Sequence, residues 1–154
     1  MPVWRALAVL AVAALAGCAS TPQATPERDA EAKRFNANPG AATIYVYRPD
    51  FPNMDENDPV LYDGDRLIGA VLAGTFFRFD VRAGTHVLRS YTHDIGSLKV
   101  DTRSGELYYV SLSAAAGHSR LALVGPDAAK REILRCCALM ENWVKGQRPL
   151  QLLR

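Results

Sequence analysis

The chain has 154 residues, of which 49% are hydrophobic, 22% charged and 8% aromatic. This composition is typical of one globular domain and too apolar for a chain that is disordered throughout. Lys and Arg number 18 against 16 Asp and Glu, a net charge of +2, which argues against a nucleic-acid-binding protein. The longest apolar run is about half of the roughly 20 residues that a membrane helix needs, which excludes a polytopic membrane protein.

The first 18 residues have the layout of an export signal, because Arg5 precedes an apolar stretch from Ala6 to Leu15 and small residues follow. The ending Leu15-Ala16-Gly17-Cys18 resembles the lipobox of bacterial lipoproteins. This resemblance implies a signal peptide over residues 1–17, cleavage before Cys18, diacylglycerol on the Cys18 thiol and acylation of the new terminus. The alternative is a plain secretory signal that happens to end in a cysteine.

Acylation of Cys18 would fix the chain to a membrane, since each buried methylene contributes roughly 0.8 kcal/mol and three chains add up to a permanent anchor. Ala19 follows in place of the Asp that retains lipoproteins in the inner membrane. For a Gram-negative source, the resemblance therefore implies the periplasmic face of the outer membrane. Cleavage removes Arg5 and no acidic residue, so 17 basic and 16 acidic side chains remain and no strong electrostatic steering follows.

Residues 18–41 predict a lipidated cysteine followed by a flexible tether. Pro, Gly, Asn and Thr are frequent here, and Phe35 is the one large apolar residue between positions 19 and 41. A coil of about 20 residues would hold the domain on the order of 25 Å from the acyl groups. Only Glu27 to Arg34 has a helix-forming composition.

From Ala42 onward the pattern is that of short strands separated by turns, which predicts a mainly β domain over residues 42–154. Phe77, Phe79 and Val81 alternate with Arg78, Asp80 and Arg82, so this strand is expected to have one buried and one wet face. Asp63-Gly64 predicts a hairpin turn. About eight short strands favour an antiparallel β-sandwich. They are expected at residues 43–47, 60–62, 67–71, 77–81, 86–91, 97–100, 107–112 and 121–124.

One C-terminal amphipathic helix is predicted over about residues 127–145, with Pro126 and Asp127 at its start and Gly146 at its end. Its apolar stripe comprises Ala129, Ile133, Cys137, Met140 and Val144. The tail from Gln147 to Arg154 carries arginines and no acid. It is compatible with an edge strand or with a segment resting on anionic headgroups.

Several of these residues, in this order, resemble the DUF2846 family of bacterial lipoproteins over about Ala30 to Val124. They are Ala32-Lys33, Phe35, Ala42, Ile44-Tyr45-Val46-Tyr47-Arg48-Pro49, Asp63-Gly64, Ile68-Gly69, Gly84, His86, Gly105 and Tyr108-Tyr109-Val110. The hairpin and Gly84-Thr85-His86 are also similar to the PEGA type of prealbumin-like domain. The resemblance implies an envelope lipoprotein with a sandwich fold and supplies no catalytic residue. It does not extend to the helix with Cys136 and Cys137.

Catalytic and cofactor motifs are not evident, and no metal or cofactor is expected. His86, His93 and His118 do not have zinc-ligand spacing. A Ser-His mechanism at His118-Ser119 would need an orienting carboxylate and an oxyanion hole, which the sequence does not indicate. The acidic stretch 55–58 lacks the ligand pattern of an EF-hand and is expected to be a solvated loop.

Cys136 and Cys137 are unusual in an exported chain, where thiols tend to oxidise. Adjacent Cα atoms lie about 3.8 Å apart, closer than in most disulfides, so a bond between the two would be strained. On a helix their side chains diverge by about 100°, which would bury Cys137 and leave Cys136 at the flank. The two hypotheses are a pair of small buried side chains and an intermolecular disulfide through Cys136.

With no catalytic constellation, the sequence favours a non-enzymatic binding or assembly module for another envelope component, a protein in the first place. The contact would use a strand edge or an exposed face bearing tyrosines. Tyr45, Tyr47, Tyr108 and Tyr109 have hydroxyls that must reach water or a partner, and we expect these four to be structural core residues. A small-ligand or glycan-binding lipoprotein is the alternative. An enzyme would need one of the three histidines within reach of Ser111, Ser119 or an acid in a cleft. The oligomeric state is left open.

Overall fold

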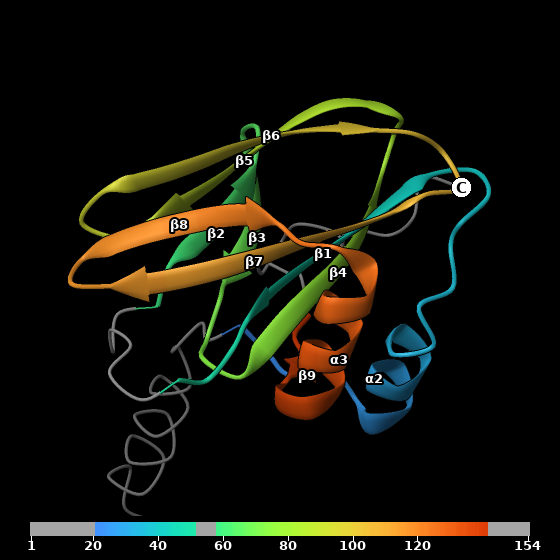
Figure 1. The fold of residues 1–154 in the computed structure, drawn as a ribbon, viewed down its shortest axis with the longest axis horizontal. Coiled ribbons are helices and arrows are strands. Elements are labelled where there is room, and N and C mark those ends of the chain that lie inside the picture. The colour runs from blue at the N-terminus through green and yellow to red at the C-terminus, as the bar shows by residue number, and fades with distance from the viewer. Residues whose placement is uncertain (1–20, 52–57, 142–154) are drawn as a thin grey trace, which may run out of the picture.

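The computed structural model describes residues 21–51 and 58–141 and contains two β-sheets packed against each other (Figure 1). The five-stranded sheet has the order β8-β7-β1-β4-β9, and the four-stranded sheet has the order β3-β2-β5-β6. The strands of the two sheets are β1 (Ala42–Arg48), β2 (Val60–Asp63), β3 (Arg66–Ala70), β4 (Thr75–Val81), β5 (Gly84–Tyr91), β6 (Ile95–Thr102), β7 (Leu107–Ala115), β8 (His118–Leu123) and β9 (Ala138–Leu139). The helices are α2 (Pro26–Ala32) and α3 (Pro126–Cys136).

The core lies between the two sheets and follows the alternation of their strands. Every second residue of β1 and β4 points inward, and β2 and β5 contribute from the other sheet. The fully or almost fully buried side chains of this core include Ile44, Val46, Leu61, Phe77, Phe79, Leu88, Val110 and Leu112. The predicted mainly β sandwich is therefore confirmed.

The hairpin between β2 and β3 forms where the Asp63-Gly64 signal predicts it. Gly64 adopts a φ of +59°, a conformation that favours glycine, and β2 and β3 pair antiparallel on either side of it. Most strand pairings are antiparallel, but β1 pairs in parallel with β7, and β4 pairs in parallel with β9. These parallel contacts join segments far apart in the sequence, which local patterns do not reveal.

The outer side of the five-stranded sheet is covered by both helices, as Figure 1 shows. Tyr45, Tyr47 and Phe76 are completely buried there, beneath residues of α2, α3 and β9. The prediction of a wet face on β4 is wrong for Asp80, whose residue is only 4% exposed. This carboxylate accepts hydrogen bonds from Thr43 and from Asn38, which belongs to the segment that crosses over the sheet.

The prediction of a flexible tether is wrong for residues 21–41, which pack on the domain. Ala24, Ala32 and Ala41 are buried, and the Phe35 ring lies 5.4 Å from that of Tyr45 between ring centroids. The Tyr45 hydroxyl donates a 2.7 Å hydrogen bond to the Ala32 carbonyl at the end of α2. The helical composition of residues 27–34 is expressed as α2, whose start is capped by the Thr25 side chain.

The C-terminal helix is confirmed but is shorter than predicted. It ends at Cys136, and Cys137 is extended, with φ −120° and ψ 138°. The chain then enters β9, where Ala138 and Leu139 pair with Thr75 and Phe76. Pairing with the free edge of β4 replaces further turns of helix, so the predicted stripe is interrupted after Ile133. Val144 and Gly146 lie outside the described residues.

Candidate functional site

The outer side of the four-stranded sheet is the exposed sheet surface of the domain, since both described helices lie on the other sheet. Directly paired residues point to the same side of a sheet. Tyr62 pairs with Arg89, and Tyr91 pairs with Ile95, while their neighbours Leu61 and Leu88 point into the core. We name this outer surface the open face. It comprises the apolar and aromatic residues Val60, Tyr62, Leu67, Val87, Tyr91 and Ile95 together with Arg89, Ser97, Lys99 and Asp101.

Two tyrosines form the aromatic centre of the open face. The rings of Tyr62 and Tyr91 meet edge to face, with centroids 5.3 Å apart and planes at 77°. Tyr91 is 37% exposed and Ile95 is 61% exposed. Exposed aromatic and aliphatic side chains of this kind are enriched at protein interfaces. The open face can therefore supply apolar contact area together with hydroxyl groups.

A hollow of about 440 Å³ opens on this face beside the two rings. Its lining consists of Val60, Tyr62, Gly64, Asp65 and Tyr91. Arg89 lies next to it and donates a 3.3 Å hydrogen bond to the Gly64 carbonyl. The hollow thus combines two aromatic rings with a carboxylate, a set that suits a polar ligand with an apolar face.

Three of the four tyrosines singled out from the sequence are core residues, as predicted. Tyr45, Tyr47 and Tyr109 are at most 2% exposed, and burial raises the pKa of each phenol. The Tyr47 hydroxyl donates to Glu132 on α3 at 2.8 Å. Tyr108 is partly buried, and its hydroxyl donates a 2.6 Å hydrogen bond to the Glu106 carboxylate. Sequence reasoning missed Tyr62 and Tyr91, although the alternation that buries Leu61 already places Tyr62 on the opposite side.

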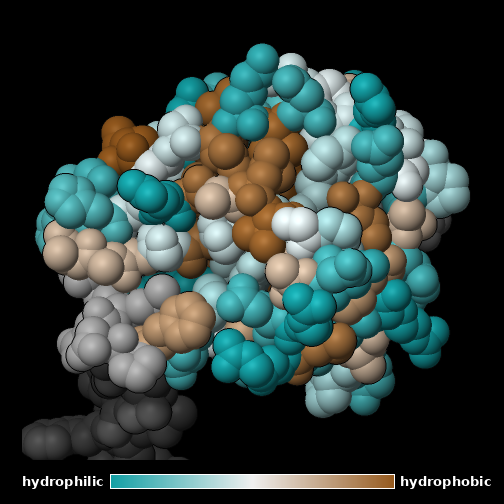
Figure 2. All heavy atoms as spheres, viewed as in Figure 1, coloured by the Kyte–Doolittle hydropathy of each residue, from teal (hydrophilic) through white to brown (hydrophobic). Residues whose placement is uncertain are grey.

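The strand edges offer less than the open face. β6 and β8 end the two sheets on the same side of the sandwich and meet where the Gly96 N–H donates to Ser119 Oγ at 3.2 Å. Figure 2 shows apolar atoms at the surface in the region where β6 and β8 lie in Figure 1. β6 itself presents the exposed charges of Lys99 and Asp101. Such charges on an edge strand disfavour the addition of another strand.

A second hollow, of about 400 Å³, lies between α2, residues 36–39 and β4. At its floor, the buried Asp80 carboxylate accepts hydrogen bonds from Thr43 at 2.6 Å and Asn38 at 2.8 Å. Arg78 reaches the Tyr45 hydroxyl at 3.2 Å and the Asn36 carbonyl at 3.4 Å. These polar groups already hold residues 36–41 on the sheet, so we assign them to the attachment of that segment.

Two histidines each contact a carboxylate. His86 Nδ1 lies 2.9 Å from Asp63, and its Nε2 lies 2.8 Å from the carbonyl oxygen of Arg82. His118 Nδ1 lies 3.0 Å from Asp94. The backbone N–H of Ser119, followed by His118 and Thr92, lowers the Asp94 pKa to about 2.

The groups around Asp94 do not form a nucleophile and its base. The Ser119 hydroxyl is buried and lies between the Ser90 carbonyl oxygen at 3.1 Å and Asp94 at 3.3 Å. A serine nucleophile would instead need a hydrogen bond to the histidine ring. The cluster therefore joins the β5–β6 turn to the start of β8, which is a structural role.

Among residues 21–51 and 58–141, no group of three or more His, Cys, Asp or Glu side chains is placed to hold a metal ion. Most of the acidic stretch 55–58 lies outside the described residues. Its last member, Asp58, forms an ion pair with the buried Arg48 at 2.9 Å. No helix in the described part of the chain is long and apolar enough to cross a bilayer.

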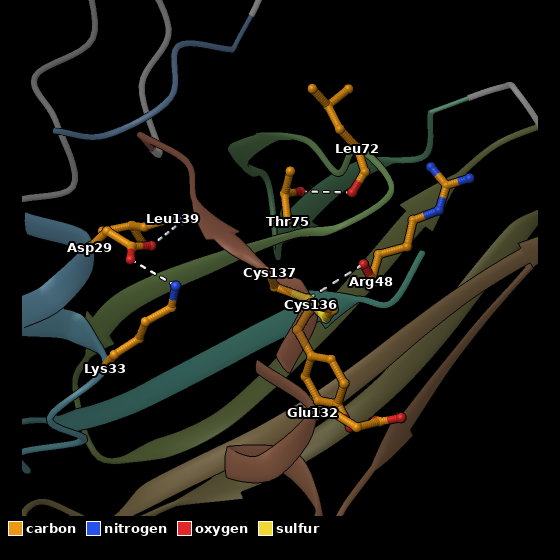
Figure 3. The surroundings of a disulfide bond; sticks show 10 residues. Asp29, Lys33, Arg48, Leu72, Thr75, Glu132, Cys136, Cys137 and Leu139 are labelled. Carbon is orange, nitrogen blue, oxygen red and sulfur yellow. Dashed lines mark hydrogen bonds and ion pairs between the residues drawn. A yellow bond between two sulfur atoms is a disulfide. The ribbon is translucent and has the colours of Figure 1, made fainter. Parts of the chain in front are cut away.

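Cys136 and Cys137 form a disulfide with each other, contrary to both hypotheses from the sequence (Figure 3). The hypotheses assumed that both residues lie on a helix. Because α3 ends at Cys136 and Cys137 is extended, their side chains do not diverge as adjacent helical residues do. Cys137 is 4% exposed, and its sulfur lies 3.8 Å from the Arg48 carbonyl oxygen. Cys136 is thereby not available for the predicted intermolecular bond.

Comparison of the sequence with models of protein families finds no match, and comparison with curated proteins finds none either. The predicted lipidation site, Cys18, lies outside the described residues. The functional assignment therefore depends on the chemistry of the chain itself.

Proposed function

We propose that this chain is a membrane-anchored envelope lipoprotein, acylated at Cys18, whose domain is a non-catalytic binding or assembly module for another envelope protein. The sequence Leu15-Ala16-Gly17-Cys18 after an apolar stretch supports the anchor and an envelope location. We expect the periplasmic face of the outer membrane if the source is Gram-negative. The partner would contact the open face.

The observation that supports the binding role is that the outer side of one sheet is covered and the outer side of the other is exposed. The five-stranded sheet is covered by α2 and α3, and its outward aromatic residues are buried. The four-stranded sheet instead keeps Tyr91 and Ile95 exposed at 37% and 61%. Large apolar side chains gathered on one surface favour a site for association. The charged edge of β6 makes strand addition less favourable than contact with the face.

The hollow beside Tyr62 and Tyr91 supports a second candidate, a small-ligand or glycan-binding lipoprotein. A sugar ring has an apolar side that can stack on an aromatic ring and hydroxyls that a carboxylate such as Asp65 can accept. A volume of about 440 Å³ accommodates a small ligand. The two candidates use the same tyrosines and differ in what is bound.

Site-specific photocrosslinking in intact cells tests both candidates. A photoreactive side chain placed at Tyr91 or Ile95 should give one discrete protein adduct, and the same group at Leu134 on α3 should not. Leu134 is a matched control because it is also exposed, at 58%, but lies on the covered side. An adduct that glycosidases remove would favour the glycan candidate. Equal labelling from all three positions, or none, would contradict a binding role for the open face.

The anchor is tested separately. Mass spectrometry of the mature terminus should find Cys18 carrying acyl chains, and fractionation should place the chain with membranes. An unmodified Cys18 or a cytosolic location would refute the lipoprotein assignment.

A further inference from the structure

The hollow on the open face has two aromatic walls that stand nearly at right angles. Tyr62 lies on β2 and Tyr91 ends β5, and the planes of their rings meet at 77° with centroids 5.3 Å apart. In an edge-to-face pair, the ring that points its edge at its neighbour keeps its own faces uncovered by that neighbour. Tyr91 is 37% exposed, and Tyr62 is half-buried. The hollow thus has a corner of aromatic rings rather than one flat platform.

A carboxylate completes this corner. Asp65 lines the hollow from the turn between β2 and β3, and it is exposed. Of the basic side chains that the structure describes, none forms an ion pair with Asp65. The face of an aromatic ring carries the negative part of its quadrupole, so it attracts cations as the carboxylate does. The rings and Asp65 therefore favour the same kind of ligand, a positively charged one.

The other charged side chains near the hollow are engaged elsewhere. Asp63 lies 2.9 Å from His86 and pairs across the hairpin with Arg66. Arg89 donates to the Gly64 carbonyl at 3.3 Å and does not line the hollow. Its positive charge opposes that of a cation bound nearby, so removing it should strengthen the binding of a cation.

An organic cation fits this arrangement better than a neutral sugar does. A sugar ring stacks on a flat aromatic surface, whereas two rings at 77° can both contact a compact ammonium or guanidinium group. A neutral ligand would also leave the charge of Asp65 without a counter-ion. Lysine and arginine side chains combine a positive charge with an apolar stem, which suits the lining by Val60 and the two rings.

We propose that the hollow receives a basic side chain, a lysine or an arginine, of the protein that contacts the open face. This inference rests on the proposed function, because it names the chemistry that the partner presents. The partner's surface around this side chain would be apolar, to match the exposed Ile95 and Tyr91. The affinity of the hollow for an organic cation is a property of the chain itself and is measured without the partner.

Titration of the full chain with a lysine analogue tests the cation site. The chain is purified in a non-ionic detergent with labelled tyrosine rings, and nuclear magnetic resonance follows Tyr62 and Tyr91 while Nα-acetyl-lysine methylamide is added. Both signals should shift to saturation. The same analogue acetylated also on Nε is neutral and should shift them much less. Equal shifts from the two analogues, or no shift from either, would refute a site for cations.

Variants around the hollow separate charge from shape. Asp65→Asn should weaken the binding of the lysine analogue about fivefold, the upper range for an exposed ion pair. Asp101→Asn removes the same charge from β6, away from the hollow, and should change binding little. Arg89→Gln should strengthen binding, whereas a site for anions would be weakened. Tyr91→Phe keeps the aromatic face and should bind as the unaltered chain does, and Tyr91→Leu should bind less. Unchanged affinity in both Asp65→Asn and Tyr91→Leu would contradict the proposal.

Photocrosslinking from Ile95 in intact cells connects the cation site with the partner. The protein adduct should be lost in Asp65→Lys, which repels a basic side chain, and kept in Asp127→Lys, a matched charge reversal at an exposed position of α3. An adduct that Asp65→Lys leaves unchanged would overturn the basic side chain but not the proposed function. Saturable binding of the lysine analogue by a chain that gives no adduct would support the cation site and overturn the protein partner.

Discussion

Trypsin sensitivity measures whether residues 21–41 are attached to the domain, because Arg28, Lys33 and Arg34 lie within them. A free coil is cut at such sites as fast as a peptide. An attached segment must first open, so its cleavage rate falls with the free energy of opening. We choose the substitution Phe35→Ala. It removes the large apolar side chain of the segment and leaves every Lys and Arg in place.

The magnitude follows from the contacts of Phe35. Its ring lies 5.4 Å from the ring of Tyr45 and 6.1 Å from that of Tyr109, and it is half-buried. Removing a fully buried phenylalanine costs about 3–5 kcal/mol, so a half-buried one should cost about 2 kcal/mol. Since every 1.4 kcal/mol is a factor of about ten, the variant should be cut about thirty times faster. Phe35 has a φ of +54°, which is no easier for alanine, so the backbone cost should cancel.

The assay follows the cleavage products after Arg28, Lys33 and Arg34 by mass spectrometry over time. Asn36→Ala is the matched control, because Asn36 is exposed and contributes its backbone carbonyl, rather than its side chain, to the contact with Arg78. This control should be cut at the rate of the unaltered chain. Rapid cleavage of all three proteins at equal rates would refute the attachment of residues 21–41 to the domain.

Three further predictions concern stability and redox state. Ile133→Ala, at a fully buried position of α3, should lower the free energy of unfolding by about 2–5 kcal/mol. Leu134→Ala, at the exposed neighbouring position, should change that free energy by no more than about 0.5 kcal/mol. Urea unfolding measures both values, and equal losses would contradict the packing of α3. Asp94→Asn should lower the melting temperature at neutral pH. The Asp94 pKa falls from 3.8 to about 2 on folding, so its contribution exists above pH 3.8 and disappears toward pH 2, where the two melting curves should converge; a constant gap would refute this. The tryptic peptide from Cys136 to Lys145 should be lighter by two hydrogen atoms before reduction than after it. Cys136→Ser should not alter the oligomeric state. A dimer of the unaltered chain that disappears on reduction would contradict the bond between Cys136 and Cys137.

Local patterns were sufficient for most of the sheet. The alternation of Phe77, Phe79 and Val81 with polar residues places β4 correctly, and Gly64 marks the hairpin turn. Each of the eight predicted strands overlaps an observed one. A strand of two residues, β9, has no pattern of its own and forms because Ala138 and Leu139 find a free edge at β4. The same contact ends α3 at Cys136, whereas the apolar stripe predicted a helix that continues past Val144.

The candidate site was harder to predict, because exposure depends on which sheet receives a cover. Tyr45 and Tyr62 both occupy strands, and both alternate with core residues. Their fates differ since α2 and α3 lie over one sheet and not over the other. Only the three-dimensional arrangement decides this. Tyr45, Tyr47 and Tyr109 are thus core residues, as predicted, whereas the sequence pattern did not single out Tyr62 and Tyr91 of the open face.

The prediction of a tether for residues 21–41 is wrong in part because several of their contacts with the domain are made by the backbone. The Ala32 carbonyl accepts from Tyr45, the Ala41 carbonyl accepts from the Gly105 N–H, and the Ala24 N–H donates to Leu139. Peptide groups are present in every sequence, so composition does not reveal such contacts. Small side chains, as at Ala24, Ala32 and Ala41, let the backbone approach closely, which makes low hydrophobicity compatible with firm attachment. A length estimate from composition alone therefore overstates the distance between an anchor and its domain wherever the sheet offers partners for the backbone.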